Sequence, residues 1–135
     1  MKLLKLLLGI LIVLSISSCT EDDIIPNDSY YVKYHYIVST RYDVYDKHST
    51  NYCSAKIKYI DSNYFERIIT HNNNYRYEYD IICGPFNYND NIELTIFDKY
   101  NVHGVLCEIF VSKNGGPFVL RYYGSNDINS YNIDF

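Results

Sequence analysis

Good helix formers become scarce in this chain after residue 18. Seven of its ten leucines lie in residues 1–18, and the rest of the chain keeps only Leu94, Leu106 and Leu120, with Ala55 as its one alanine. The same later part carries all 17 tyrosines and all six phenylalanines. Aromatic and β-branched residues suit a pleated, half-buried surface, whereas leucine and alanine favour helices. We therefore expect an all-β fold.

Alternation of apolar and polar residues locates the expected strands. Residues 31–38 alternate with period two, and residues 53–59 do the same. Further strands are expected at 64–70, 75–83, 92–96, 105–111 and 118–123, and residues 128–134 are a candidate edge strand. Turn residues separate them at Asp61–Asn63, at Asn72–Asn74, at Gly84-Pro85 and at Asn114-Gly115.

About seven short strands with a turn every dozen residues are typical of an antiparallel, immunoglobulin-like β-sandwich. We expect this single domain to span residues 29–135, and a small β-barrel is the alternative. Because leucine is scarce, aromatic side chains should form much of its core.

The first 18 residues have a different character from the rest. Lys2 and Lys5 precede a short apolar run, and small residues follow it, as in a secretory signal peptide. The run ends in Ile16-Ser17-Ser18-Cys19, which resembles the lipobox of bacterial lipoproteins. The resemblance implies cleavage before Cys19 and attachment of lipid to that residue, which would hold the protein to a membrane. The alternative is an ordinary cleaved signal peptide with Cys19 unmodified.

Residues 19–28 are expected to form an acidic tether. Its beginning, Thr20-Glu21-Asp22-Asp23, resembles the acidic export signal of Bacteroidota surface lipoproteins. The resemblance implies that Glu21, Asp22 and Asp23 direct the domain to the outer face of the outer membrane. A periplasm-facing anchor is the alternative, since any solvated linker can be acidic.

Three cysteines remain if Cys19 carries lipid. At most one intramolecular disulfide can then form, and an exported protein is in a compartment that permits one. Cys53 and Cys107 are the favoured pair, because the second and sixth strands face each other across an immunoglobulin-type sandwich. The alternative is that Cys53, Cys83 and Cys107 are all buried free thiols.

Charge and motifs argue against several functions. The whole chain has a net charge of -4, and loss of Lys2 and Lys5 leaves 10 basic and 16 acidic residues, a net charge of -6. A basic footprint for nucleic acid is lacking, so we expect no nucleic-acid partner. The four histidines show no zinc-ligand spacing, and no common hydrolase or nucleotide-binding motif occurs. We therefore expect no metal, no cofactor and no enzyme activity, and we expect the carboxylate pairs Asp43/Asp46 and Glu78/Asp80 to be solvated charges.

Tyrosine in the expected loops is the main positive indication of function. Tyrosine surrounded by asparagine and serine is typical of recognition surfaces, because it offers amphipathic contact area at small entropic cost. We expect a binding surface for a protein or a glycan, and the alternative is that these tyrosines merely cap the ends of the sandwich. The residues concerned are Tyr42, Tyr45, Tyr52, Tyr88 and Tyr100.

The strand segments YVKYHY, AKIKY, CGPF and EIFVSKNGGPFVLRYYG, together with the lipobox, resemble small immunoglobulin-like lipoproteins of the Bacteroidota. This resemblance covers most of the chain after residue 18 and implies fold and anchoring, but transfers no functional residue. We expect a lipid-anchored binding or accessory module of the envelope or cell surface. An immunity-type or structural envelope lipoprotein is the alternative, and an enzyme is the least favoured.

Overall fold

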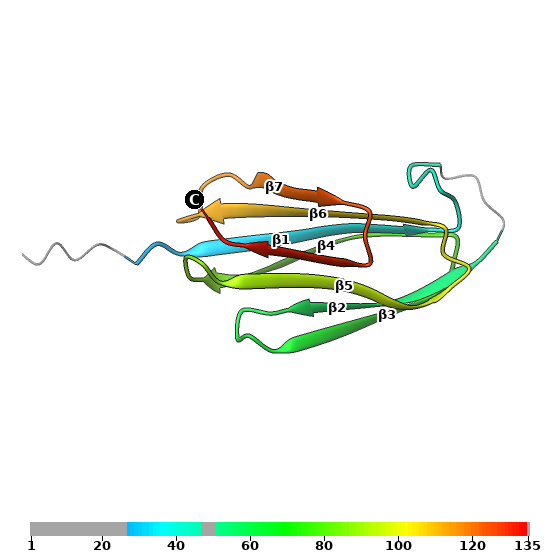
Figure 1. The fold of residues 1–135 in the computed structure, drawn as a ribbon, viewed down its shortest axis with the longest axis horizontal. Helices are drawn as coiled ribbons and strands as arrows, with labels where there is room; N and C mark the ends of the chain where they lie inside the picture. Colours follow the sequence, from blue (N-terminus) through cyan, green and yellow to red (C-terminus); the bar gives the residue numbers. More distant parts are fainter. Residues whose placement is uncertain (1–26, 47–50, 135) are drawn as a thin grey trace, which may run out of the picture.

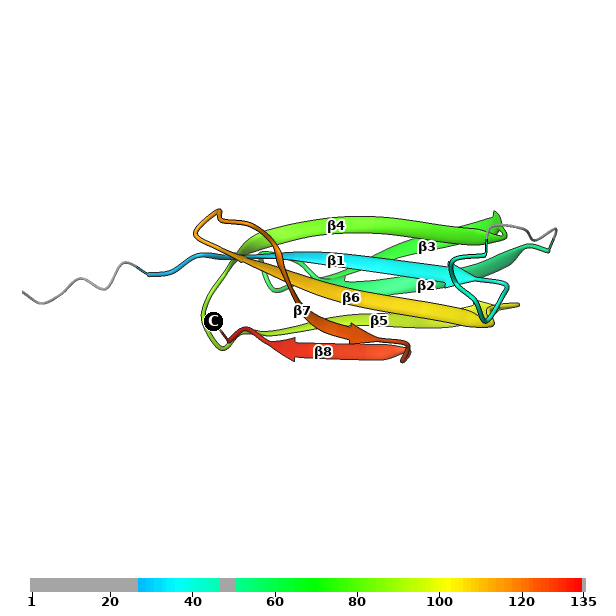
Figure 2. The ribbon, with the colours of Figure 1, turned by 90° about the horizontal axis from the view of Figure 1, so that it is seen from above.

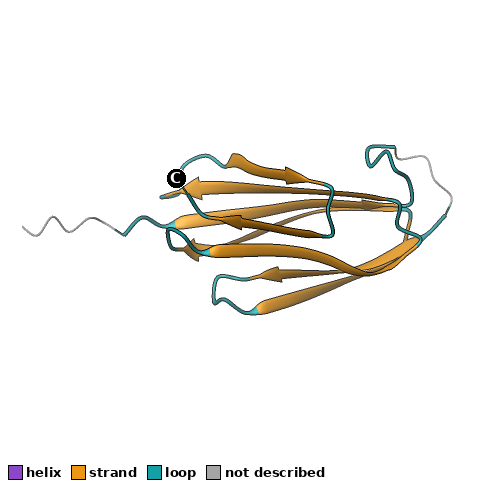
Figure 3. Cartoon of the chain, in the orientation of Figure 1, coloured by secondary structure: helices purple, strands orange, loops and turns teal. Residues whose placement is uncertain are grey.

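The computed structural model describes residues 27–46 and 51–134, and all of its regular elements are β-strands (Figure 3). The eight strands follow one another along the chain as shown in Figure 1. Their bounds are β1 (Tyr30–Ser39), β2 (Cys53–Ile60), β3 (Glu66–Asn74), β4 (Arg76–Phe86), β5 (Asn91–Tyr100), β6 (Gly104–Lys113), β7 (Val119–Gly124) and β8 (Ile128–Asn132).

The strands form two four-stranded antiparallel sheets, which confirms the predicted β-sandwich and excludes the closed barrel. One sheet has the order β4-β1-β6-β7 and the other β3-β2-β5-β8. We call them sheet A and sheet B. The candidate edge strand at 128–134 is present as β8, so the sandwich has eight strands rather than seven. Figure 2 shows β7 and β8 side by side, where the chain passes from one sheet to the other.

In sheet B the neighbouring strands β5 and β8 are separated along the chain by β6 and β7, which belong to sheet A. In sheet A, β1 pairs antiparallel with β4 on one side and with β6 on the other. Beside β1 lies β6, joined to β7 by a hairpin whose turn residues Asn114 and Gly115 both have positive φ, 52° and 74°. Positive φ at both positions is what a type I′ turn requires and what an Asn-Gly pair readily adopts.

The core lies between the sheets and is strongly aromatic, as expected. The alternating residues of β1 point into it, and their tyrosines Tyr30, Tyr34 and Tyr36 are buried. Two of the phenols bond across the core: Tyr34 donates to the carbonyl of Ile60 at 3.1 Å, and Tyr36 is hydrogen-bonded to His71. Among the described residues, no buried side-chain nitrogen or oxygen lacks a hydrogen-bond partner. Tyrosine can therefore replace leucine in this core without leaving polar atoms unsatisfied.

Two turn predictions were wrong. Asn72–Asn74 was predicted as a turn, but these residues belong to β3, which pairs with β2 as far as the Cys53–Asn74 partners. Asparagine favours turns by local preference, but here pairing with β2 keeps the segment extended. Gly84-Pro85 was predicted to end a strand, but β4 continues to Phe86, which pairs with Tyr30. The Asn72–Asn74 and Gly84-Pro85 segments both lie on edge strands. On an edge strand one row of backbone groups has no strand partner, so turn-forming residues and proline can be accommodated there.

The two ends of the sandwich differ in what they carry. The chain enters at the start of β1, and we call this the entry end; the opposite end, where β1 finishes and β2 begins, is the far end (Figure 1). At the entry end Asp28 forms a 2.6 Å ion pair with Lys113 and accepts a 2.8 Å bond from Asn114. The bond from Lys113 holds the pKa of Asp28 below its usual value. These contacts hold Asp28 against the β6–β7 turn.

Candidate functional site

The structure separates the five predicted binding tyrosines into two groups. Tyr88 lies in the β4–β5 turn at the entry end, where its ring is 6.4 Å from that of Tyr30. The other four belong to segments that meet at the far end: the loop after β1, the start of β2 and the end of β5. They are Tyr42, Tyr45, Tyr52 and Tyr100.

All four far-end tyrosines are exposed. Tyr42 has 87% of its surface accessible and Tyr100 has 72%, although buried tyrosines of the same chain are fully enclosed. The Tyr52 backbone is held at 2.8 Å by the Asn101 amide, which links the start of β2 to the end of β5. The far end thus presents aromatic side chains on a backbone fixed by neighbouring strands.

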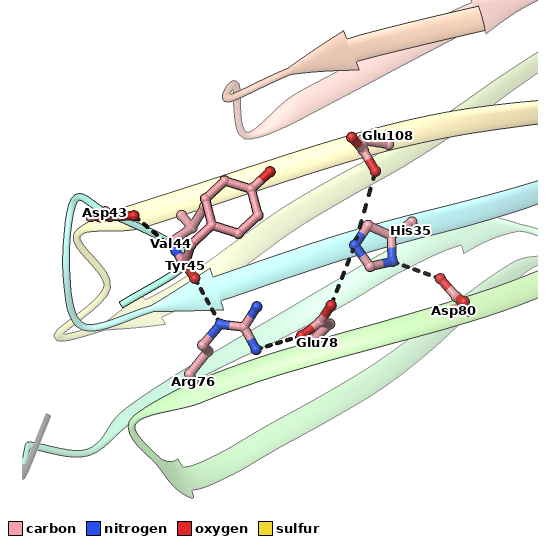
Figure 4. A network of polar contacts seen from close by, with 8 residues as sticks. All are labelled: His35, Asp43, Val44, Tyr45, Arg76, Glu78, Asp80 and Glu108. Carbon is pink, nitrogen blue, oxygen red and sulfur yellow. Dashed lines mark hydrogen bonds and ion pairs between the residues drawn. The ribbon is translucent and has the colours of Figure 1, made fainter. Parts of the chain in front are cut away.

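The loop that carries Tyr42 and Tyr45 is held against the outer face of sheet A. Val44 is buried there in a small apolar cluster with Ile37 and Leu106. The Arg76 side chain, only 9% exposed, donates a 2.7 Å bond to the Val44 carbonyl, as Figure 4 shows. Gly104 permits this approach, because a Cβ there would lie 2.1 Å from the Arg41 carbonyl oxygen. The loop is thus positioned by the fold before any partner binds.

An open cavity of about 360 Å³ lies beside this loop. Its walls come from the loop after β1 and from the β5–β6 connection. The two segments are linked where the His103 backbone N–H donates a 2.9 Å hydrogen bond to the Ser39 carbonyl. The Tyr42 and His103 rings lie 5.5 Å apart at 48°. Arg41 and Asp46 form a 2.7 Å ion pair within the lining. The residues that line the cavity are Thr40, Arg41, Tyr42, Asp43, Asp46 and His103.

A second set of charges extends from the loop along the outer face of sheet A (Figure 4). Arg76 contacts Glu78 at 2.5 Å, and the His35 ring is surrounded by Asp80, Glu78 and Glu108 at 2.6, 3.9 and 4.0 Å. Arg76 is thus one cation beside three carboxylates, which come from β4 and β6 and surround the His35 ring of β1. Within residues 27–46 and 51–134, no group of three or more His, Cys, Asp or Glu side chains could hold a metal ion.

Cys53, Cys83 and Cys107 are free thiols in the structure, so the favoured Cys53–Cys107 bridge is not formed. The two residues do lie in opposite sheets, as the sequence argument required, and both are buried in the shared core. Burial raises the pKa of Cys107 to about 12 and also raises the pKa of Cys53 and Cys83. Cys53 and Cys107 thus occupy the core as small apolar groups, and Cys83 packs against it partly buried, so the predicted alternative of buried free thiols holds for two of the three.

The predicted lipid and export residues, Cys19, Glu21, Asp22 and Asp23, lie outside the described residues. In the described part of the chain, no helix has the length and apolar character needed to span a membrane.

Sequence reasoning missed the grouping of Asp43 and His103 with Tyr42. Asp43 was expected to be a solvated charge, and His103 was noted only as lacking a histidine or cysteine neighbour. No local spacing connects the two residues, because they come from different interstrand loops. The one local indication is Gly104 after His103, since a glycine at a strand start can mark a close backbone approach.

Comparisons with protein-family models, with curated proteins and with solved structures found no match to this chain.

Proposed function

We propose that this chain is a lipid-anchored envelope protein that binds a protein or glycan partner through the far end of its β-sandwich. The observation that carries the proposal is the collection of four exposed tyrosines at that end, remote from the point where the chain enters the domain. Tyrosine gives large, rigid and amphipathic contact area, and it is enriched where proteins recognise partners.

The geometry suits an anchored receptor. If lipid on Cys19 holds the chain to a membrane, the short tether joins the domain at the entry end, where Asp28 is hydrogen-bonded to Asn114. A strand the length of β1, with 10 residues at about 3.3 Å each, then carries the far-end loops outward by about 30 Å. The tyrosines would face away from the anchoring membrane, where a partner can approach them.

The loop's fixed position favours recognition over simple capping of the core. Tyr42 is 87% exposed and so buries little surface, whereas Val44, two residues later, holds the loop against Ile37 and Leu106 on the outer face of sheet A. A side chain needed only to close the sandwich would be buried against it. Ordering the loop beforehand also lowers the entropic cost of binding.

Site-specific photo-crosslinking in intact cells tests this proposal. A benzophenone amino acid would replace Tyr42 or Tyr100 at the far end, and Tyr88 at the entry end would serve as the matched control. We expect discrete adducts from the far-end positions and none from position 88. Equal adducts from all three positions, or none from the far end of a correctly localised protein, would contradict the proposal. Digestion of an adduct with glycosidases or proteases distinguishes a glycan from a protein partner.

A further inference from the structure

We propose that the far-end cavity holds a cationic side chain, a guanidinium or ammonium group, presented by a protein partner. This inference rests on the proposed function and specifies the chemistry that the same end of the sandwich would recognise. The cavity of about 360 Å³ falls in the lower part of the 300–1,000 Å³ range of ligand pockets. It is therefore large enough for one long side chain.

Charge within the cavity points to a cation. The Arg41 guanidinium is already paired with Asp46 at 2.7 Å, so these two lining charges compensate each other. Asp43 forms no ion pair with a described residue, and its Oδ1 only accepts a 3.0 Å bond from the Tyr45 backbone. That bond fixes the carboxylate without neutralising it. The lining thus holds one uncompensated negative charge, which a guanidinium or ammonium group would match.

The aromatic pair beside Asp43 adds a second reason. Tyr42 and His103 lie 5.5 Å apart at the cavity, and Tyr42 is almost fully accessible. The face of a tyrosine ring attracts a cation through its quadrupole, most strongly when the cation is partly withdrawn from water. The chain uses the same interaction elsewhere, where the Lys33 ammonium lies 4.2 Å from the centre of the Phe110 ring. A carboxylate next to an open aromatic face is suited to a basic side chain.

The charge of the whole molecule agrees with this chemistry. The chain from Cys19 onward has 10 basic and 16 acidic residues, a net charge of -6. Most of the basic residues of the described part are paired with acids, as Lys56 is with Asp98 and Lys99 with Asp127 near the far end. A basic protein would be attracted to such a surface, and complementary charge would speed its association.

Titration of the full chain, purified in detergent as the cell produces it, tests the inference. The probes are N-acetyl-L-arginine amide and its citrulline analogue, which has almost the same shape without the charge. NMR should show saturable shifts of the Tyr42, Asp43 and His103 resonances with the arginine probe only. Asp43→Asn should weaken this binding by about fivefold or more, because it removes the charged acceptor.

Two further variants keep the test decisive. Asp134→Asn removes one negative charge, as Asp43→Asn does, but at the entry end. It should leave the affinity for the arginine probe unchanged. Tyr42→Leu removes the ring of an exposed side chain without disturbing the core, and it should weaken binding even if Asp43→Asn folds poorly.

Other outcomes separate the inference from the function on which it rests. Equal shifts with the arginine and citrulline probes would overturn the cation assignment. So would shifts with D-glucose but not with arginine, and these would indicate a saccharide site at the same end. Absence of any shift, combined with far-end crosslinks in cells, would overturn the cation assignment while leaving the proposed function intact. Absence of crosslinks would contradict the proposed function itself.

Discussion

The phenol of Tyr36 and the Nε2 of His71 are hydrogen-bonded at 2.7 Å across the interior of the sandwich. Tyr36 belongs to β1 of sheet A and His71 to β3 of sheet B, so this bond joins the two layers. Both side chains are buried, and the His71 ring also stacks on Tyr77 at 4.4 Å. The side of the core between the edge strands β3 and β4 is therefore closed by polar aromatic residues, and its stability depends on their hydrogen bonding.

Tyr36→Phe should destabilise the domain by about 1–3 kcal/mol. The variant keeps the ring and its packing, but it leaves a buried nitrogen of His71 without its partner, which costs more than the bond itself. Urea unfolding followed by circular dichroism measures the change. Tyr79→Phe is the matched control, because Tyr79 stacks on Tyr36 but is 53% exposed. This variant should change the free energy of unfolding by no more than about 0.5 kcal/mol. Equal effects from the two variants would contradict the assigned role.

The same histidine should make stability depend on pH. Burial lowers the pKa of His71 below its ordinary 6.5, so the folded state favours the neutral ring. The unfolded chain therefore binds a proton more readily below pH 6.5, and the stabilisation present above that pH is lost as the pH falls toward the folded pKa. The free energy of unfolding should decrease from pH 7 to pH 5.5.

His71→Phe separates this effect from other titrations. The variant keeps an aromatic ring in the cluster but cannot take up a proton, so the decrease between pH 7 and pH 5.5 should become smaller. His103→Phe, at an exposed position, serves as the control and should retain the decrease. If the His71 variant loses stability with falling pH as steeply as the native chain, another group is responsible.

The central strands β1, β2, β5 and β6 could be predicted from the sequence because each has one buried face. The period-two pattern around Tyr34 or Ile57 is a local property, and the structure confirms it. The role of His71 could not be predicted, since it depends on the continuation of β3 through Asn72–Asn74 and on the pairing of edge strands in opposite sheets.

The candidate site was only partly predictable for a related reason. Composition identified the loop tyrosines, but which of them lie together depends on strand order. Tyr88 was grouped with Tyr42 in the sequence, and the structure places the two at opposite ends. Asp43 and His103 line the same cavity although they come from different loops, and the small Gly104 lets the Arg41 carbonyl lie close to β6.

Gly104→Ala should displace the loop that carries Tyr42 and Asp43. A Cβ at this position would lie 2.1 Å from the Arg41 carbonyl oxygen and 2.8 Å from Cγ1 of Val44, which requires the backbone to move. We expect a loss of about 1–3 kcal/mol and altered His103 ring resonances in NMR spectra. Val105→Ala, the next position in β6, serves as the control: it should destabilise the domain without moving the His103 signals. Unchanged His103 signals in the glycine variant would show that the loop does not depend on this contact.

Thiol titration should find three free cysteines in the unreduced, denatured protein whose Cys19 carries the proposed lipid. In the folded protein their reaction with a disulfide reagent should be slow, because burial raises the pKa of all three and places that of Cys107 near 12. Cys83, which is only half-buried, should react first. One thiol instead of three after denaturation would establish a bridge, and peptide mapping would show whether Cys53 and Cys107 form it.

Anchoring and export depend on residues that precede the sandwich, and they can be tested separately from it. Cys19→Ala should release the protein from membranes, since the proposed lipid is its attachment. Replacement of Glu21, Asp22 and Asp23 by alanine should leave the protein lipidated but protect it from protease added to intact cells, whereas the native chain is cleaved. Alanine at Asp43, Asp46 and Asp98 removes equal charge from the domain and should leave cleavage unchanged. If the native protein resists protease while lipidated and folded, the far end faces the periplasm, and its basic partner should be sought among envelope proteins.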